Sequence, residues 1–296
     1  MNLTRALQFY SFKNIDITTE QWDQFQKEYA GKVTDINIDV VLNPACLSDL
    51  NNLVKAHGGS LCPRLRKLHI GRNDRQEEGH WTSIVELLAQ PTLKEVEVVQ
   101  GCLKNASMND VIYTLVAKAP HIDTVEIFTP AFCPDYGAFS EAKRLSVDGF
   151  FDHATWRACA ALPKLERLEI WDASYYEPLD AERRQTYAVT FVSLTKLGIH
   201  DEDEQRHPNF IASIFRNTTM PLLQTLELGC SRDVNMGMVR RCLAKRSPLL
   251  REIELNGKEE KGPIEIVDGG GGDGEDEEEN EGSADVDDEY GSDHYQ

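Results

Sequence analysis

The side chains best suited to catalysis or metal binding are dispersed along this chain. Its 296 residues contain no G-x-S-x-G turn, no G-x-x-x-x-G-K-[ST] phosphate loop, no H-E-x-x-H motif and no G-x-G-x-x-G after a strand-like run. The stretch His200-Asp201-Glu202-Asp203, with His207, crowds metal-ligating residue types together. Its spacing fits no defined metal site, and a polar loop explains it better. We therefore expect no enzymatic activity, no bound metal and no cofactor.

Charge divides the chain into two parts. Of its 50 acidic residues, 13 lie in residues 268–296, where there is no Lys or Arg, so residues 1–267 hold 37 acids against 31 bases. The tail is rich in glycine and poor in apolar side chains, a composition that predicts disorder. Its stretch Gly271-Gly272-Asp273-Gly274-Glu275-Asp276 matches the start of a calcium-binding nonapeptide, but Glu278 stands where the pattern needs an apolar residue. Neither part is basic, so we expect no nucleic-acid binding.

The compartment is inferred from the N-terminus and the cysteines. The sequence MNLTRALQFYSFKN does not resemble a secretory signal, and no run approaches the roughly 18–20 apolar residues of a membrane span. The 7 cysteines are scattered without a C-x-x-C pair. An odd, unclustered set is typical of reduced thiols, so the sequence predicts a protein of the cytoplasm, the nucleus or both, without membrane contact.

A short phrase, apolar-x-x-apolar-x-apolar, recurs along the chain and is often preceded by proline. The last apolar residues of successive copies are 20 to 32 residues apart, a spacing typical of leucine-rich repeats. Its period of two predicts a short strand whose x positions face away from the core. The clearest copies are 63–70, 91–98, 163–170, 221–228 and 248–255, and weaker copies end at Ile17, Ile38, Ile127, Val147 and Ile199.

Apolar residues with the spacing of one helix face follow several of these phrases. The step after Ile127 contains Pro130, Pro134 and Gly137, which predict a loop in place of a helix. A unit of strand, turn and helix cannot bury its apolar face alone, so about ten units must stack. We predict an α/β fold, a leucine-rich-repeat solenoid over residues 1–267, curved and right-handed, with a parallel sheet on its concave face and helices outside. The predicted helix faces are Trp81, Ile84, Leu87 and Leu88; Ile112, Leu115 and Val116; Phe210, Ile211, Ile214 and Phe215; and Val239, Cys242 and Leu243.

The N-terminal part resembles a known family. The stretch from Ile15 to Phe25, containing Trp22, is followed by Tyr29-Ala30 and by Val33-x-x-Ile36. This pattern is similar to the W-x-x-F-x-x-Y-A-x-x-V-x-x-L stretch that follows the F-box in fungal F-box/leucine-rich-repeat proteins. Repeats like 162–170 come after it in that family, and the resemblance covers roughly residues 10–256.

The resemblance implies a role in substrate recognition. In that family the F-box docks a Skp-type linker of a cullin–RING ubiquitin ligase, and the repeats hold the protein substrate. No F-box segment is visible in this chain, so we expect it to bind a Skp-type linker only if such a segment precedes Met1. The alternative from the residues is a scaffold or chaperone-like binder of basic proteins outside any ligase, acting through the acidic tail and the concave face.

The x position between the last two apolar residues is acidic in six of the ten phrases, which defines a candidate surface. Stacked carboxylates on adjacent strands repel one another unless cations intervene. Compensating bases stand two positions earlier, at Lys67, Arg144, Arg167 and Lys196. One reading is an exposed column balanced by its neighbours, and the other is an acidic track for a basic partner. The acidic members are Asp16, Glu97, Glu126, Glu169, Glu227 and Glu254.

Aromatic side chains gather one residue further along the strands. Trp171 is predicted to face solvent, and an exposed Trp gains burial only when something covers it. The loop 172–180, with Tyr175 and Tyr176, or a bound protein provides that cover, and the sequence does not decide between them. The candidate partner-binding residues are Phe128, Arg144, Arg167, Glu169, Trp171, Tyr175, Tyr176 and His200.

Overall fold

The computed structural model describes residues 23–24, 27–28, 30–38, 44–57, 60–71, 78–99, 105–129, 134–149, 153–171, 188–201, 215–230 and 236–261. These residues all belong to one unit, Met1–Glu265. The predicted tail 268–296, the phrase ending at Ile17 and the segment 207–214 lie outside them.

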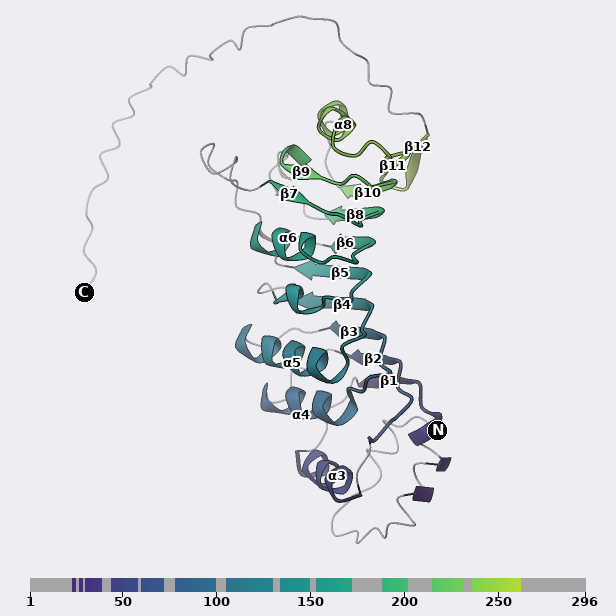
Figure 1. The fold of residues 1–296 in the computed structure, drawn as a ribbon, viewed down its shortest axis with the longest axis vertical. Helices are drawn as coiled ribbons and strands as arrows, with labels where there is room; N and C mark the ends of the chain where they lie inside the picture. The colour runs from purple at the N-terminus through teal and green to yellow at the C-terminus, as the bar shows by residue number, and fades with distance from the viewer. Residues whose placement is uncertain are drawn as a thin grey trace, which may run out of the picture. The chain divides into compact units, whose positions relative to one another are not determined.

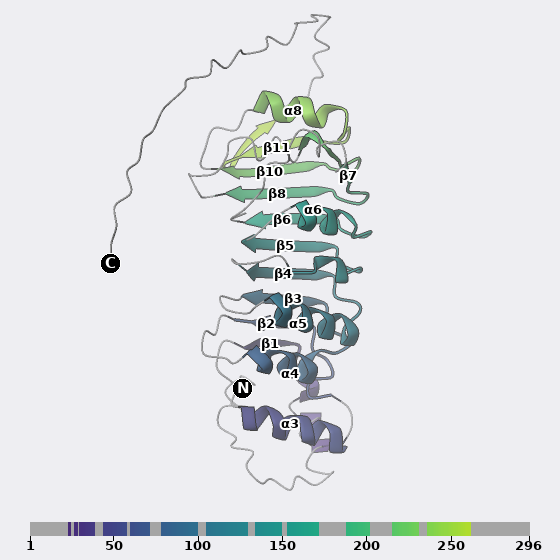
Figure 2. The ribbon, with the colours of Figure 1, turned by 90° about the vertical axis from the view of Figure 1, so that its left-hand side faces the viewer.

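Among the described residues, ten strands form one sheet in the order β1-β2-β3-β4-β5-β6-β8-β10-β11-β12. The first nine are parallel, each paired with the next copy of the phrase (Figures 1 and 2). The α/β class and the parallel sheet are thus confirmed, and nine of the ten phrases form strands. The strands are β1 (Asp35–Ile38), β2 (Lys67–Ile70), β3 (Glu95–Val99), β4 (Thr124–Thr129), β5 (Arg144–Gly149), β6 (Arg167–Trp171), β8 (Lys196–Asp201), β10 (Thr225–Cys230), β11 (Glu252–Leu255) and the antiparallel β12 (Lys258–Lys261).

The proline before many strands has a structural role. In the turn Leu162-Pro163-Lys164-Leu165 the N–H of Leu165 donates to the carbonyl of Leu162, and the same bond closes the turns ending at Leu65, Leu93, Ile122, Ala142, Leu223 and Leu250. Proline is the second residue in six of these seven turns. Proline favours this position because its fixed φ matches the turn and the turn needs no N–H there. The last residue of each turn is buried.

A second backbone contact repeats between neighbouring units. The carbonyl of Thr34 accepts from the N–H groups of Arg66 and Lys67, and the carbonyl of Arg66 accepts from the next pair, Lys94 and Glu95. This double contact occurs eight times in succession, up to the carbonyl of Gln224. The start of each strand is therefore held in the same position relative to the start of the strand before it.

The helices form a layer on one side of the sheet (Figure 1). Helix α4 packs between α3 and α5, and the 3-10 helix η2 contacts α5 and α6. Helices α4, α5 and α8 coincide with predicted apolar faces, and η2 confirms that no α-helix occupies the described part of the step after Ile127. The elements are η1 (Ala30–Lys32), α3 (Pro44–His57), α4 (Glu78–Leu88), α5 (Asn105–Lys118), η2 (Tyr136–Ala138), α6 (His153–Ala160) and α8 (Met236–Ala244).

Three short strands were not predicted. Strands β7 (Val189–Thr190) and β9 (Thr218–Thr219) form a separate parallel pair. Strand β12 closes an antiparallel hairpin on β11, with Asn256 and Gly257 at φ 49° and 72° in its two-residue turn. Asn-Gly favours such turns because both residues tolerate positive φ. The sequence of β12 is Lys-Glu-Glu-Lys, and charged residues on an edge strand discourage pairing with another chain.

The strands bury their apolar side chains on one face. Leu68, Leu168, Leu197 and Leu226 occupy the same position of the phrase and have no exposed surface. The intervening residues of β2 and β6 are half-buried, so the predicted phase of the strands is confirmed. Because side chains alternate along a strand, this phase places every x position on the face away from the helices.

Candidate functional site

The side of the sheet away from the helices, here called the open face, carries three rows of side chains. Parallel pairing aligns equivalent residues of successive strands, so each row runs across the sheet. Row 1 is Asp35, Lys67, Glu95, Thr124, Arg144, Arg167, Lys196, Thr225 and Glu252. Row 2 is Asn37, His69, Glu97, Glu126, Ser146, Glu169, Gly198, Glu227 and Glu254. Row 3 is Val99, Phe128, Asp148, Trp171, His200 and Gly229.

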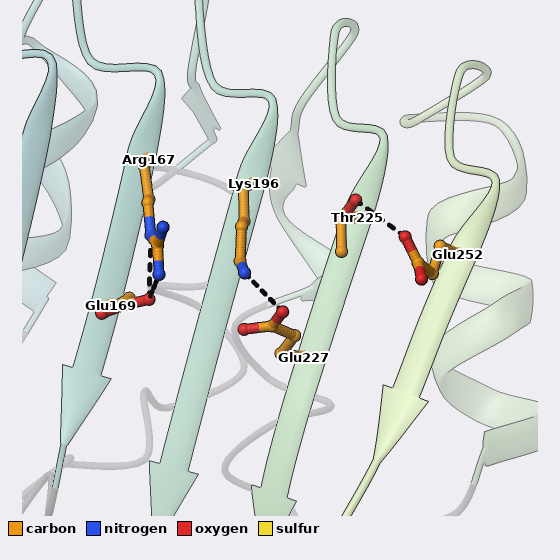
Figure 3. A network of polar contacts seen from close by, with 6 residues as sticks. All are labelled: Arg167, Glu169, Lys196, Thr225, Glu227 and Glu252. Atoms are coloured by element: carbon orange, nitrogen blue, oxygen red, sulfur yellow. Dashed lines mark hydrogen bonds and ion pairs between the residues drawn. The ribbon is translucent and has the colours of Figure 1, made fainter. Parts of the chain in front are cut away.

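Several charges of the open face are paired. The side chain of Arg167 turns along its own strand, where Nε donates to Oε1 of Glu169 at 2.9 Å. In contrast, Lys196 reaches across to Glu227 on β10, and the hydroxyl of Thr225 donates to Glu252 on β11 (Figure 3).

Two further pairs join β2 to β3. Nζ of Lys67 lies 3.4 Å from Oε2 of Glu95, and Nδ1 of His69 lies 2.7 Å from Oε2 of Glu97. Three of the four predicted bases, Lys67, Arg167 and Lys196, therefore neutralise neighbouring carboxylates. This pairing offsets part of the repulsion expected between acids on adjacent strands.

Acids still outnumber bases on this face. The three rows contain nine carboxylates and four Lys or Arg side chains, a net charge of −5 with histidine neutral. Residues 1–267 as a whole carry a net charge of only −6. The open face therefore carries a net charge nearly as large as that of residues 1–267 as a whole.

Among the described residues, Glu126 is the carboxylate whose surroundings raise its pKa. It is half-buried, and within the described residues it makes no hydrogen bond or ion pair. Burial raises its pKa above the ordinary value, and the nearby charge of Glu97 raises it further, with smaller contributions from Glu169 and Glu95. Lys67 acts in the opposite direction. Ionisation of Glu126 is therefore less favourable in the folded protein than in the unfolded chain.

A small hollow opens beside Glu126. Its volume is about 220 Å³. Ser146 is the shortest side chain of row 2 other than glycine, and it lies between the longer Glu126 and Glu169 on the two neighbouring strands. This difference in side-chain length explains the depression. The hollow is lined by Glu95, Thr124, Val125, Glu126, Arg144, Leu145, Ser146, Arg167 and Glu169.

The aromatic part of the open face is built around a stacked pair. The rings of Trp171 and His200 lie 4.0 Å apart with an angle of 15° between their planes. The imidazole sits over two glycines, since a Cβ on Gly229 would lie 2.7 Å from its Nδ1 and a Cβ on Gly198 would lie 3.0 Å from its Nε2. Glycine at both positions therefore permits the stack. Trp171 nevertheless remains 38% exposed.

The structure brings most of the predicted binding residues together. Phe128, Arg144, Arg167, Glu169, Trp171 and His200 all lie on the open face of β4, β5, β6 and β8. Tyr175, Tyr176 and Asp16 lie outside the described residues. Sequence reasoning placed Gly198 in the column of row 2 but did not include Glu95, Asp148 or Gly229, although each lies two residues from the row 2 residue of its own strand.

The described residues contain no metal-binding cluster, and of their free cysteines two are buried and one, Cys242, is partly exposed. Within them, no group of three or more His, Cys, Asp or Glu side chains could hold a metal ion. Cys62 and Cys159 are buried free thiols. Burial raises the pKa of Cys62 to about 12, so this thiol stays protonated at neutral pH and is a poor nucleophile.

No protein-family model matches the chain, and no curated protein matches it. No helix in the described part of the chain is long and apolar enough to cross a membrane.

Replacing Glu126 should stabilise the protein. A raised folded-state pKa means that ionisation of Glu126 opposes folding above its unfolded-state pKa of about 4.3, and that this opposition vanishes below that pH. We expect Glu126→Gln to raise the free energy of unfolding at pH 7, by an amount that shrinks as pH falls toward 4. Urea denaturation at several pH values measures this difference.

Glu141 is the matched control for this experiment. Nζ of Lys164 donates to its carboxylate at 2.7 Å, and this hydrogen bond lowers the pKa of Glu141. Its contribution to stability is present above the unfolded-state pKa and is lost as pH falls. Glu141→Gln should therefore produce a small loss of stability at pH 7, of opposite sign to the Glu126 effect. A loss for both variants would contradict the assigned environment of Glu126.

Proposed function

We propose that this chain is a leucine-rich-repeat solenoid that recognises another protein through the open face of its sheet. The repeat is supported by the eight successive carbonyl contacts and by the seven equivalent turns that precede the strands. In this proposal the open face is the concave face and the helices lie outside it. Solenoids of this kind use such a surface for binding because it is broad and continuous.

The observation that carries the proposed function is the exposed Trp171–His200 stack. A tryptophan that keeps 38% of its surface exposed beside charged rows has the residue type and setting of an interface hot spot. The glycines beneath His200 leave room for the imidazole to stack on Trp171. A partner protein would complete the burial of Trp171.

The resemblance to fungal F-box/leucine-rich-repeat proteins makes the partner a substrate of an SCF-type ubiquitin ligase, in the cytoplasm or nucleus. On this view the open face corresponds to the substrate-binding repeats. The second candidate is a non-ligase scaffold or chaperone-like binder of basic proteins, which is favoured by the net charge of −5 on the open face and by the 13 acids of residues 268–296.

The test compares proteins captured by the wild-type chain, by Trp171→Ala and by Tyr113→Ala. Tyr113 is the matched control, because it is an aromatic side chain 51% exposed on α5, which lies in the helix layer. We expect a set of proteins whose recovery, measured by quantitative mass spectrometry, falls with Trp171→Ala and is unchanged by Tyr113→Ala. Equal recovery with all three chains would contradict recognition through the open face.

Salt and tail deletion separate the two candidates. Binding anchored by Trp171 should survive moderate salt and removal of residues 268–296. Binding driven by the tail should weaken steeply as the Debye length falls from about 10 Å at 0.1 M to about 3 Å at 1 M salt, and should disappear with the tail. The affinity of a captured protein at two salt concentrations decides between them.

A further inference from the structure

The hollow above Ser146 has the size of a single side chain. Its volume of about 220 Å³ is below the roughly 300–1,000 Å³ of pockets that hold drug-sized molecules. It lies in the middle of the open face, with Ser146 as its floor and Glu126 and Glu169 on the flanking strands. The surface thus offers a socket for one side chain of a bound protein.

The charges around the hollow decide which side chain fits. Of its charged groups, Glu95 is paired with Lys67 and Glu169 with Arg167, which leaves Glu126 and Arg144 without an ion pair among the described residues. Arg144 is exposed, so water solvates its guanidinium. Glu126 is half-buried and close to other carboxylates. Only the carboxylate therefore needs a partner, and that partner must be a cation.

The aromatic residues next to the hollow favour the same occupant. Phe128 and Trp171 stand in row 3 on β4 and β6, about 10 Å apart across two strand spacings of roughly 4.8 Å. His200 on β8 stacks on one face of the indole, so the other face is turned toward β5, where Asp148 stands in row 3. A cationic side chain that crosses row 3 to reach the hollow lies within range of both aromatic rings.

We propose that the hollow above Ser146 receives an arginine or lysine side chain from a basic segment of the bound protein, with its charged end between Glu126 and Glu169. This inference rests on the proposed function and adds the chemistry of the partner to it. The net charge of −5 on the open face attracts a basic segment, and the hollow fixes the position of one of its cationic side chains.

The test begins with a random 12-residue phage-display peptide library selected on the full-length chain. We expect the enriched peptides to contain a shared Arg or Lys. Replacing that residue by the uncharged isostere citrulline or norleucine, or introducing Glu126→Gln, should each weaken binding about tenfold, equivalent to about 1.4 kcal/mol. The two changes together should weaken binding little more than either alone, because they remove the same contact.

Glu254→Gln is the matched control. Glu254 lies in row 2 with no ion pair among the described residues, but on β11, far along the row from the hollow. A general electrostatic attraction would be weakened equally by Glu254→Gln and Glu126→Gln, whereas the proposed socket requires an effect of Glu126→Gln alone. Fluorescence polarisation of a labelled peptide measures each affinity.

The outcomes separate this inference from the proposed function. Peptides that lose binding with Trp171→Ala but carry no base, or that respond equally to both glutamate variants, would overturn the inference and leave the proposed function standing. Selection that yields no peptide dependent on Trp171 or Glu126 would count against both. Peptides that depend on Trp171, Glu126 and their own base support both.

Discussion

Replacing Leu168 with Ala should lower the free energy of unfolding by about 2–5 kcal/mol. The side chain of Leu168 has no exposed surface and lies between Leu145 on β5 and Leu197 on β8, which are also buried. Removing it leaves a cavity that its neighbours on β5 and β8 cannot fill without shifting the sheet. Leu68 and Leu226 occupy the same position on β2 and β10 and should show losses in the same range. Urea denaturation followed by circular dichroism measures the change.

The control for this prediction is Glu169→Gln on the same strand. Glu169 lies on the open face and is half-buried, and its ion pair with Arg167 is partly exposed to solvent. Partly exposed pairs of this kind contribute about 0–1 kcal/mol, so the loss should be at the low end of that range. Equal losses for Leu168→Ala and Glu169→Gln would show that the alternation of buried and open-face residues is wrong.

Replacing Trp156 with Ala should cost about 3–5 kcal/mol. Trp156 on α6 is among the largest fully buried side chains, and its Nε1 donates to Oγ1 of Thr218 at 3.0 Å. Its ring also meets that of Phe191 edge to face, with centroids 4.6 Å apart. One side chain thus joins α6 to the residues beside β7 and to β9, three parts of the chain far apart in sequence.

Trp156→Phe and Phe191→Leu resolve the parts of this effect. Trp156→Phe removes the hydrogen bond but keeps an aromatic ring. Because part of the packing is retained, it should lower the free energy of unfolding less than Trp156→Ala does. A double-mutant cycle that combines Trp156→Ala with Phe191→Leu should give a coupling energy of about 0.5–1.5 kcal/mol for the aromatic pair. A coupling energy of zero would mean that the two rings do not meet in solution.

The strands were predictable because their signal is local. Each phrase carries its own alternation of apolar and polar residues, and the strand phase followed from it at Leu68 and Leu168 alike. The hairpin of β12 has an equally local signal in Asn256-Gly257, a strong short-range turn former, although it was not predicted. The pair β7–β9 had no such signal, because two-residue strands are too short to show a period.

The sequence by itself therefore determined the α/β class, the strand positions and which residues face away from the helices, since burial of a repeated apolar pattern requires them. Only the tertiary structure decided how those residues combine. Arg167 pairs within its own strand whereas Lys196 reaches the next one, and the hollow above Ser146 and the Trp171–His200 stack depend on neighbours 20 or more residues away in the chain. The physical reason is that side-chain partners across a parallel sheet are set by the register between strands, which arises only when the successive units pack together.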